Sequence, residues 1–112
     1  MNPVLEAALG NRTAAWTLLF LAAYGEGHAN RIARTFGIAV SVVRDQLLRL
    51  EGEGALVSRH VGRSRVFEFN ERNPTARNLR GFLRAELDLL TEDDLQRYFR
   101  QRQRPRRTGK RL

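Results

Sequence analysis

The sequence predicts a mainly α-helical domain that carries one two-stranded β-hairpin. Three observations lead to this prediction. Apolar residues recur at helical spacing along most of the chain, which is typical of amphipathic helices. Segments 56–61 and 65–69 are instead rich in β-branched and aromatic residues, and they flank the short glycine-containing loop Gly62-Arg63-Ser64, as in a hairpin. A length of 112 residues allows a single modest core.

The first half of the chain predicts four helices. They are expected over residues 3–8, 13–24, 28–36 and 40–51. Asn2 and Pro3 are an N-cap and a first-turn proline, and Gly37 stands where a helix C-terminus favours positive φ. Segment 13–24 is apolar nearly all round, so it needs two burying surfaces. Because a domain this small offers one, we expect the second surface to be another subunit.

The chain after the hairpin predicts two more helices and a basic tail. Asn73 and Pro74 open a helix that we expect to reach Leu90. Thr91 facing Asp94 resembles a capping signal that restarts a helix. The final stretch, "RQRQRPRRTGKRL", holds six Arg, one Lys and no acid. We therefore expect a domain over residues 1–90, a helical extension over 91–103 and a disordered basic tail over 104–112.

The net charge of +8 is concentrated in that final stretch. The rest of the chain carries 13 basic against 12 acidic residues, so the body is close to neutral. Nineteen of the 20 basic residues are Arg, whose planar fork binds phosphate or guanine bidentately. An arginine-rich genome would produce the same bias. The tail is expected to act as an electrostatic arm toward a polyanion; the alternative is a solvated tail that makes no such contact or serves only solubility.

Composition also argues against several classes of protein. The chain has no cysteine, which removes disulfides and thiolate metal sites and fits a cytoplasmic location. It has no apolar run long enough to span a membrane and no evident signal peptide. His28 and His60 are the only histidines and lack a carboxylate pair at ligand spacing, and no nucleotide-binding glycine loop is present. We therefore expect no enzyme activity, no cofactor and no metal.

Helix, glycine turn, helix and basic-tipped hairpin follow one another in the order of a winged helix-turn-helix. "IARTFGI" (32–38), the later "LLRLE", and "GALVSRHVGRSRVFEFN" (54–70) resemble the core of ArsR-type and related winged-helix regulators. "LGNRTAA" (9–15) and "NERNPTARNLRGFL" (70–83) look like the flanks of a subgroup sometimes associated with small nucleotidyltransferases. The likeness covers residues 9–90. It implies a winged helix-turn-helix with extra terminal helices, without the ligand set of a metal sensor.

In that fold the second helix of the turn enters the major groove and reads base edges with its first residues. The expected reading residues here are Val40, Ser41, Arg44 and Asp45. Arg44 can pair with guanine, and Val40 offers methyl groups to thymine. The expected backbone contacts are Arg63 and Arg65 on the wing, together with Arg31, Arg34 and Arg49. The last three have an alternative interpretation as ordinary solvated charges.

Three residues depart from the pattern of the resembled families. Ala39 stands where a serine commonly caps the reading helix, so Ser41 or nothing caps it. Asp45 stands where an arginine is frequent, and phosphate repels a carboxylate unless it accepts from cytosine or orients a neighbouring arginine. Leu48 falls at a usually polar position and is interpreted as wing packing.

The first and last helices form the dimer in the resembled families. The expected interface residues here are Trp16, Phe20, Leu79, Leu83, Leu87 and Leu90. The stripe on the later helix has an alternative interpretation, which is that it closes the core of the monomer.

The function predicted is a homodimeric, cytoplasmic regulator of transcription that binds double-stranded DNA and represses by steric occlusion, with an unknown small-molecule or protein effector. The alternative is a protein-interaction module, such as an antitoxin-like partner of a small enzyme. The near-neutral body and Asp45 favour it, whereas Arg44, the wing arginines and the tail favour DNA. A third reading, RNA binding, normally shows exposed aromatic residues for base stacking, and the wing tip has none.

Overall fold

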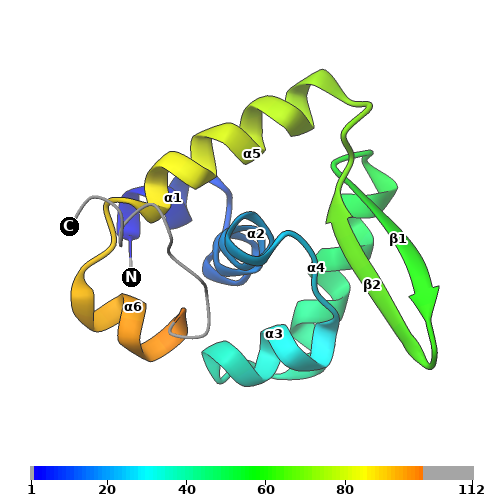
Figure 1. Ribbon diagram of the computed structural model, residues 1–112, viewed down its shortest axis with the longest axis horizontal. Helices are drawn as coiled ribbons and strands as arrows, with labels where there is room; N and C mark the ends of the chain where they lie inside the picture. The colour runs from blue at the N-terminus through cyan, green and yellow to red at the C-terminus, as the bar shows by residue number, and fades with distance from the viewer. Residues whose placement is uncertain (1, 100–112) are drawn as a thin grey trace, which may run out of the picture.

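The computed structural model describes residues 2–99, which form helices around a central helix and one projecting hairpin (Figure 1). The elements are α1 (Pro3–Ala8), α2 (Arg12–Tyr24), α3 (Ala29–Phe36), α4 (Val40–Gly52), β1 (Leu56–Val61), β2 (Ser64–Phe69), α5 (Pro74–Leu87) and α6 (Glu92–Tyr98). The predicted fold class is confirmed. The basic tail lies outside the described residues.

Helix α2 is the centre of the core. Every residue from Ala14 to Ala22 is buried, and α2 contacts α1, α3, α4, α5 and β2. Figure 1 shows it nearly end-on with the other helices around it. The chain itself thus supplies the second burying surface. The expectation that another subunit supplies this surface was wrong, because α5 folds back across the side of α2 that α3 and α4 leave open.

The capping signals act as the sequence predicts. The side-chain oxygens of Asn2, Asn73 and Thr91 each accept a hydrogen bond, at 3.1 Å, from the backbone N–H three residues on. Asn11, which was not predicted as a cap, does the same for α2 at 2.7 Å. Ala39 caps α4 without a side-chain hydrogen bond, so the alternative in which nothing caps this helix is correct.

Helix α5 ends three residues earlier than expected. Its last turn tightens, because the N–H groups of Asp88, Leu89 and Leu90 donate to carbonyls three residues back. This turn redirects the chain into α6, where Tyr98 and Phe99 pack on Phe36 with ring centroids 5.3 and 5.9 Å apart. The restarted helix is confirmed, and its aromatic residues fasten it to α3.

The hairpin pairs β1 and β2 in antiparallel register from Leu56 opposite Phe69 to Val61 opposite Ser64. The loop is therefore the two residues Gly62 and Arg63, one fewer than predicted, with Gly62 at φ +62°. Within residues 2–99, no helix is long and apolar enough to cross a membrane.

A one-residue strand, not predicted from the sequence, extends the hairpin. The N–H of Gly27 donates to the carbonyl of Phe67 at 3.0 Å, and the N–H of Phe67 donates back at 2.9 Å. A Cβ at Gly27 would lie 2.6 Å from Cε1 of the buried Phe20. Only glycine fits this position without displacing a packed ring. The two backbone hydrogen bonds hold the segment before α3 beside the hairpin.

Candidate nucleic-acid interface

The exposed side of α4, the start of α3 and the hairpin together border a hollow of about 270 Å³. Its lining includes His28, Asn30, Arg44, Leu48, Arg63 and Arg65. Leu48 lines this hollow together with the hairpin residues and is 41% exposed; that it packs on the wing stays an interpretation. The hollow combines three guanidinium groups with a small apolar area.

Two of these three guanidinium groups are free within the described chain. Arg44, on α4, and Arg63, at the hairpin tip, are exposed. Neither makes a hydrogen bond, ion pair or ring contact with any residue of the 2–99 range. Because they come from different elements that border one hollow, an anion entering it would meet positive charge from two sides.

Arg65 is already engaged. Its Nη2 donates to Glu51 Oε1 at 2.6 Å, and its Nε donates to Ser58 Oγ at 3.0 Å. Its guanidinium also lies 5.4 Å from the ring centroid of Phe67. The two wing arginines therefore differ: Arg65 is bonded to Glu51 and Ser58, whereas Arg63 is free within residues 2–99. The sequence had placed both among the expected DNA contacts.

The expected reading residues lie on the outer side of α4. Ser41, Arg44 and Asp45 are exposed and Val40 is half-buried, while Val43 on the same helix is completely buried. This exposure agrees with the assignment from the sequence. That these residues read bases stays a prediction.

The three expected backbone anchors differ from one another. Arg34 is exposed and has no partner among residues 2–99. Arg49 instead donates from Nε and Nη2 to Gln46 Oε1, at 3.2 and 2.8 Å. Arg31 lies over the ring of Tyr24, with its Cζ 4.7 Å from the centroid. Of the three, Arg34 is the one whose charge is unengaged within this range.

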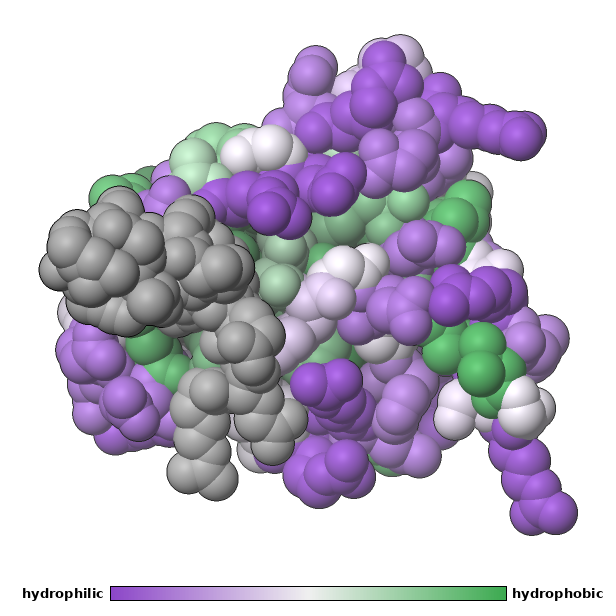
Figure 2. Space-filling model, viewed as in Figure 1, coloured by the Kyte–Doolittle hydropathy of each residue, from purple (hydrophilic) through white to green (hydrophobic). Residues whose placement is uncertain are grey.

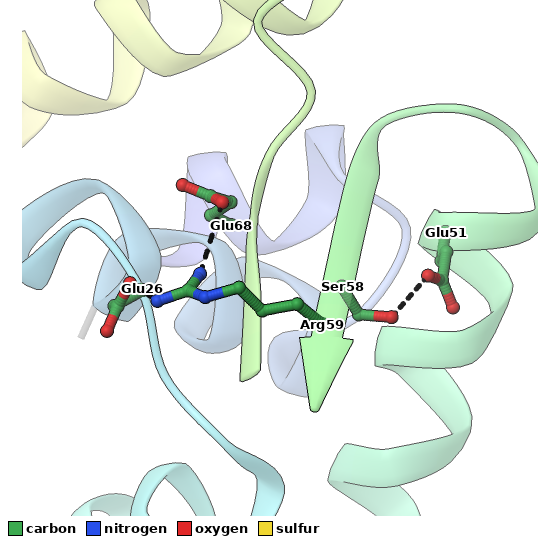
Figure 3. A network of polar contacts seen from close by, with 5 residues as sticks. All are labelled: Glu26, Glu51, Ser58, Arg59 and Glu68. Carbon is green, nitrogen blue, oxygen red and sulfur yellow. Dashed lines mark hydrogen bonds and ion pairs between the residues drawn. The ribbon is translucent and has the colours of Figure 1, made fainter. Parts of the chain in front are cut away.

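An ion-pair network on the other side of the hairpin was not predicted. Arg59 donates to Glu26 at 2.8 Å and to Glu68 at 3.2 Å (Figure 3). The hydrogen bond from Arg59 to Glu26, followed by the charge of that carboxylate, raises the pKa of Arg59 above its ordinary value. Arg59 and Glu68 share a hairpin face in the observed register, so cross-strand spacing could have identified this pair.

The expected interface residues lie mostly in the core of the single chain. Trp16 is 7% exposed, and Phe20, Leu83 and Leu87 are completely buried. Leu79 and Leu90 are half-buried against that core. Their placement agrees with the alternative that the stripe closes the monomer. The apolar side chains that α5 and its C-terminal turn expose are Phe82 at 50% and Leu89 at 72%.

The surface around the hairpin is mostly hydrophilic in the view of Figure 2, with a small green area at the hairpin. Val57 and Val61 on β1 are 39% and 51% exposed. In the described part of the chain, no group of three or more His, Asp or Glu side chains could hold a metal ion. His28 instead caps α3, accepting from the N–H of Arg31 at 3.3 Å.

The fold is that of winged helix-turn-helix transcription regulators. MepR, a transcription regulator of a Staphylococcus aureus multidrug efflux pump, is 17% identical with a TM-score of 0.57 over 84% of this chain and 76% of its own. Mb0332 of Mycobacterium bovis, described as a homodimeric winged helix-turn-helix DNA-binding domain and a possible ArsR-family regulator, is 21% identical with a TM-score of 0.54 over 80% of each chain.

A third similar structure is YusO of Bacillus subtilis, at 17% identity and a TM-score of 0.54. The similarity covers 76% of this chain and 66% of YusO, just under two thirds of its length. No protein-family model matches the sequence, and no curated protein matches it either. At these identities the likeness establishes the fold alone.

Proposed function

We propose that this protein binds double-stranded DNA and regulates transcription. Helix α4 would lie in the major groove, with the hairpin as a wing on the adjacent backbone. The observation that carries the proposal is the pair of free guanidinium groups, Arg44 and Arg63, bordering one hollow from the helix and from the wing tip. In a winged helix bound to a duplex, cationic groups at these two places can contact base edges and phosphates.

The two arginines would have different tasks. Arg44 lies about one turn into α4, where a side chain reaches base edges, and bidentate pairing with guanine discriminates by about 1–3 kcal/mol. Arg63 lies at the loop, where contact with a phosphate adds affinity but carries little sequence information. The uncapped start of α4 supports the same orientation, because Ala39 has no side-chain acceptor that would compete with a phosphate for the first amides.

The proposal extends to a cytoplasmic homodimer that represses by covering its operator. The exposed Phe82 and Leu89 support a protein contact along α5, and the homodimeric description of Mb0332 supports the same assembly for this fold. Two copies would place their reading helices about one DNA turn, roughly 34 Å, apart. The expected interface thus moves from the buried leucines of α5 to its exposed face.

Direct binding measurements test the proposal. The full chain is titrated into labelled duplex DNA, single-stranded DNA and duplex RNA of one sequence at low salt, and its binding site is then selected from random duplexes. We expect a preference for duplex DNA and a recovered consensus. Equal binding to all three polymers, or failure to recover a consensus, would contradict the proposal, because the protein would then bind nucleic acid only through electrostatic attraction.

The alternative is a protein-interaction module. The exposed carboxylate of Asp45, which has no partner within residues 2–99, favours it, because a carboxylate beside Arg44 weakens the attraction to phosphate. If the module reading is right, Asp45→Asn leaves duplex affinity negligible. If the DNA reading is right, the same variant binds duplexes more tightly and less selectively.

A further inference from the structure

The last turn of α4 is joined to the wing by a closed set of hydrogen bonds. Ser58 Oγ donates to Glu51 Oε2 at 2.5 Å (Figure 3). Arg65 donates to the other carboxylate oxygen of Glu51 at 2.6 Å and to Ser58 Oγ at 3.0 Å. Each of the three side chains thus bonds to both of the others, and we call this set the clasp.

The clasp turns Arg65 away from the wing tip. Arg65 pairs with His60 in the hairpin, whereas Ser58 lies two residues nearer the hairpin base, opposite Phe67. The guanidinium bonds to Ser58 and to Glu51, which belongs to α4, so the side chain runs back toward the base. Arg63, by contrast, remains at the tip without a partner in the described chain.

The position of the clasp suits a role in orienting the wing relative to α4 better than a role in stabilising the fold. The side chains of Arg65 and Glu51 are 44% and 25% exposed, and solvent screening makes such pairs weak contributors to folding. The clasp nevertheless joins the reading helix to the wing. On the opposite side of the hairpin, Arg59 reaches Glu26 in the α2–α3 loop, so polar contacts brace the wing from both faces.

We propose that Glu51 is a positioning residue for DNA recognition. With Ser58 it holds Arg65 against the end of α4, so that Arg65 sets the spacing between the reading helix and the wing and does not contact a phosphate. This inference rests on the proposed function, and it reassigns Arg65, which the sequence had placed among the DNA contacts.

Salt dependence of binding to a random duplex tests this assignment, because each phosphate contact adds about 0.9 to the slope of log K against log salt. We expect Arg63→Ala to lower the slope by about 0.9, which is about a 3.5-fold smaller loss of affinity between 50 and 200 mM salt. Arg65→Ala, the matched control, should leave the slope unchanged. Glu51→Gln should raise it by about 0.9, because the freed Arg65 then reaches phosphate. The gain should vanish in Glu51→Gln combined with Arg65→Ala.

The inference is overturned if Arg65→Ala lowers the slope as much as Arg63→Ala, or if Glu51→Gln leaves it unchanged. A readout without DNA separates these failures from failure of the proposed function. In NMR spectra of the free protein, the Nε–H of Arg65 should exchange with water more slowly than that of Arg63. Glu51→Gln and Ser58→Ala should both remove this protection. Equal exchange in the wild type would overturn the clasp whether or not the protein binds DNA.

Discussion

Replacing Arg44 with alanine should weaken binding to a selected duplex by about 1–3 kcal/mol, or roughly 5- to 150-fold. The range assumes one bidentate contact to a guanine, which the structure allows because Arg44 is exposed and unpartnered within residues 2–99. No folding cost should accompany the change, since an exposed side chain without partners contributes within about 0.5 kcal/mol to stability.

Arg49 is the matched control, because it is an exposed arginine on the same helix but bonds to Gln46. Arg49→Ala removes the same formal charge and should weaken binding to the selected duplex less than Arg44→Ala does. The assay measures fluorescence anisotropy at fixed salt with the selected duplex and with duplexes changed at one base pair each. Arg44→Ala should flatten the preference at one base pair per half-site. If both variants lose equal affinity, or if the base preferences of Arg44→Ala match those of the wild type, then α4 does not read sequence through Arg44.

Three further results are expected. Leu83 is completely buried, so Leu83→Ala should cost about 2–5 kcal/mol of unfolding free energy, whereas Arg84→Ala, at an exposed position next to it, should cost less than about 1 kcal/mol; equal costs in urea unfolding would contradict the placement of α5. Burial raises the pKa of Glu6, but hydrogen bonds from the indole of Trp16 and the backbone of Asn2 outweigh it and lower the pKa below 4.5. The ionised Glu6 carboxylate therefore stabilises the fold above pH 4.5, and this contribution is lost as the pH falls through the lowered pKa. In an acid titration, Trp16 fluorescence should report this transition, and Glu6→Gln should abolish it. Deleting residues 104–112 removes five cationic residues and should weaken binding to selected and random duplexes by a similar factor with a shallower salt slope; an unchanged slope would mean that this segment does not touch phosphate.

Short-range signals explain most of what the sequence predicted. An N-cap acts within three residues, so Asn73 and Thr91 could be identified from their immediate neighbours. The hairpin was likewise predictable from two runs of β-branched and aromatic residues around a short glycine loop, and α4 from helical spacing. The bridge between Gly27 and Phe67 was missed because a one-residue strand has no alternating pattern to detect.

The states of Arg65 and Arg59 depended in part on contacts that sequence spacing does not reveal. Arg65 bonds to Glu51 across 14 positions, and Arg59 to Glu26 across 33. Both pairs exist only because the hairpin packs beside α4 and the α2–α3 loop. Phe20, which was expected at a dimer contact, is completely buried within the chain for a related reason: an apolar stripe indicates burial, but it does not say whether the same chain provides the partner.

Mapping the surface that DNA covers is the sharpest test of DNA binding through α4 and the wing. Backbone amide shifts of the full chain are recorded while a selected duplex is added. If α4 and the wing tip bind the duplex, the largest changes fall on residues 40–45 at the start of α4 and on Gly62 and Arg63 at the wing tip, with little change around Glu26 and Glu68 on the opposite side of the hairpin. Changes concentrated on that opposite side, with α4 unaffected, would contradict this mode of binding.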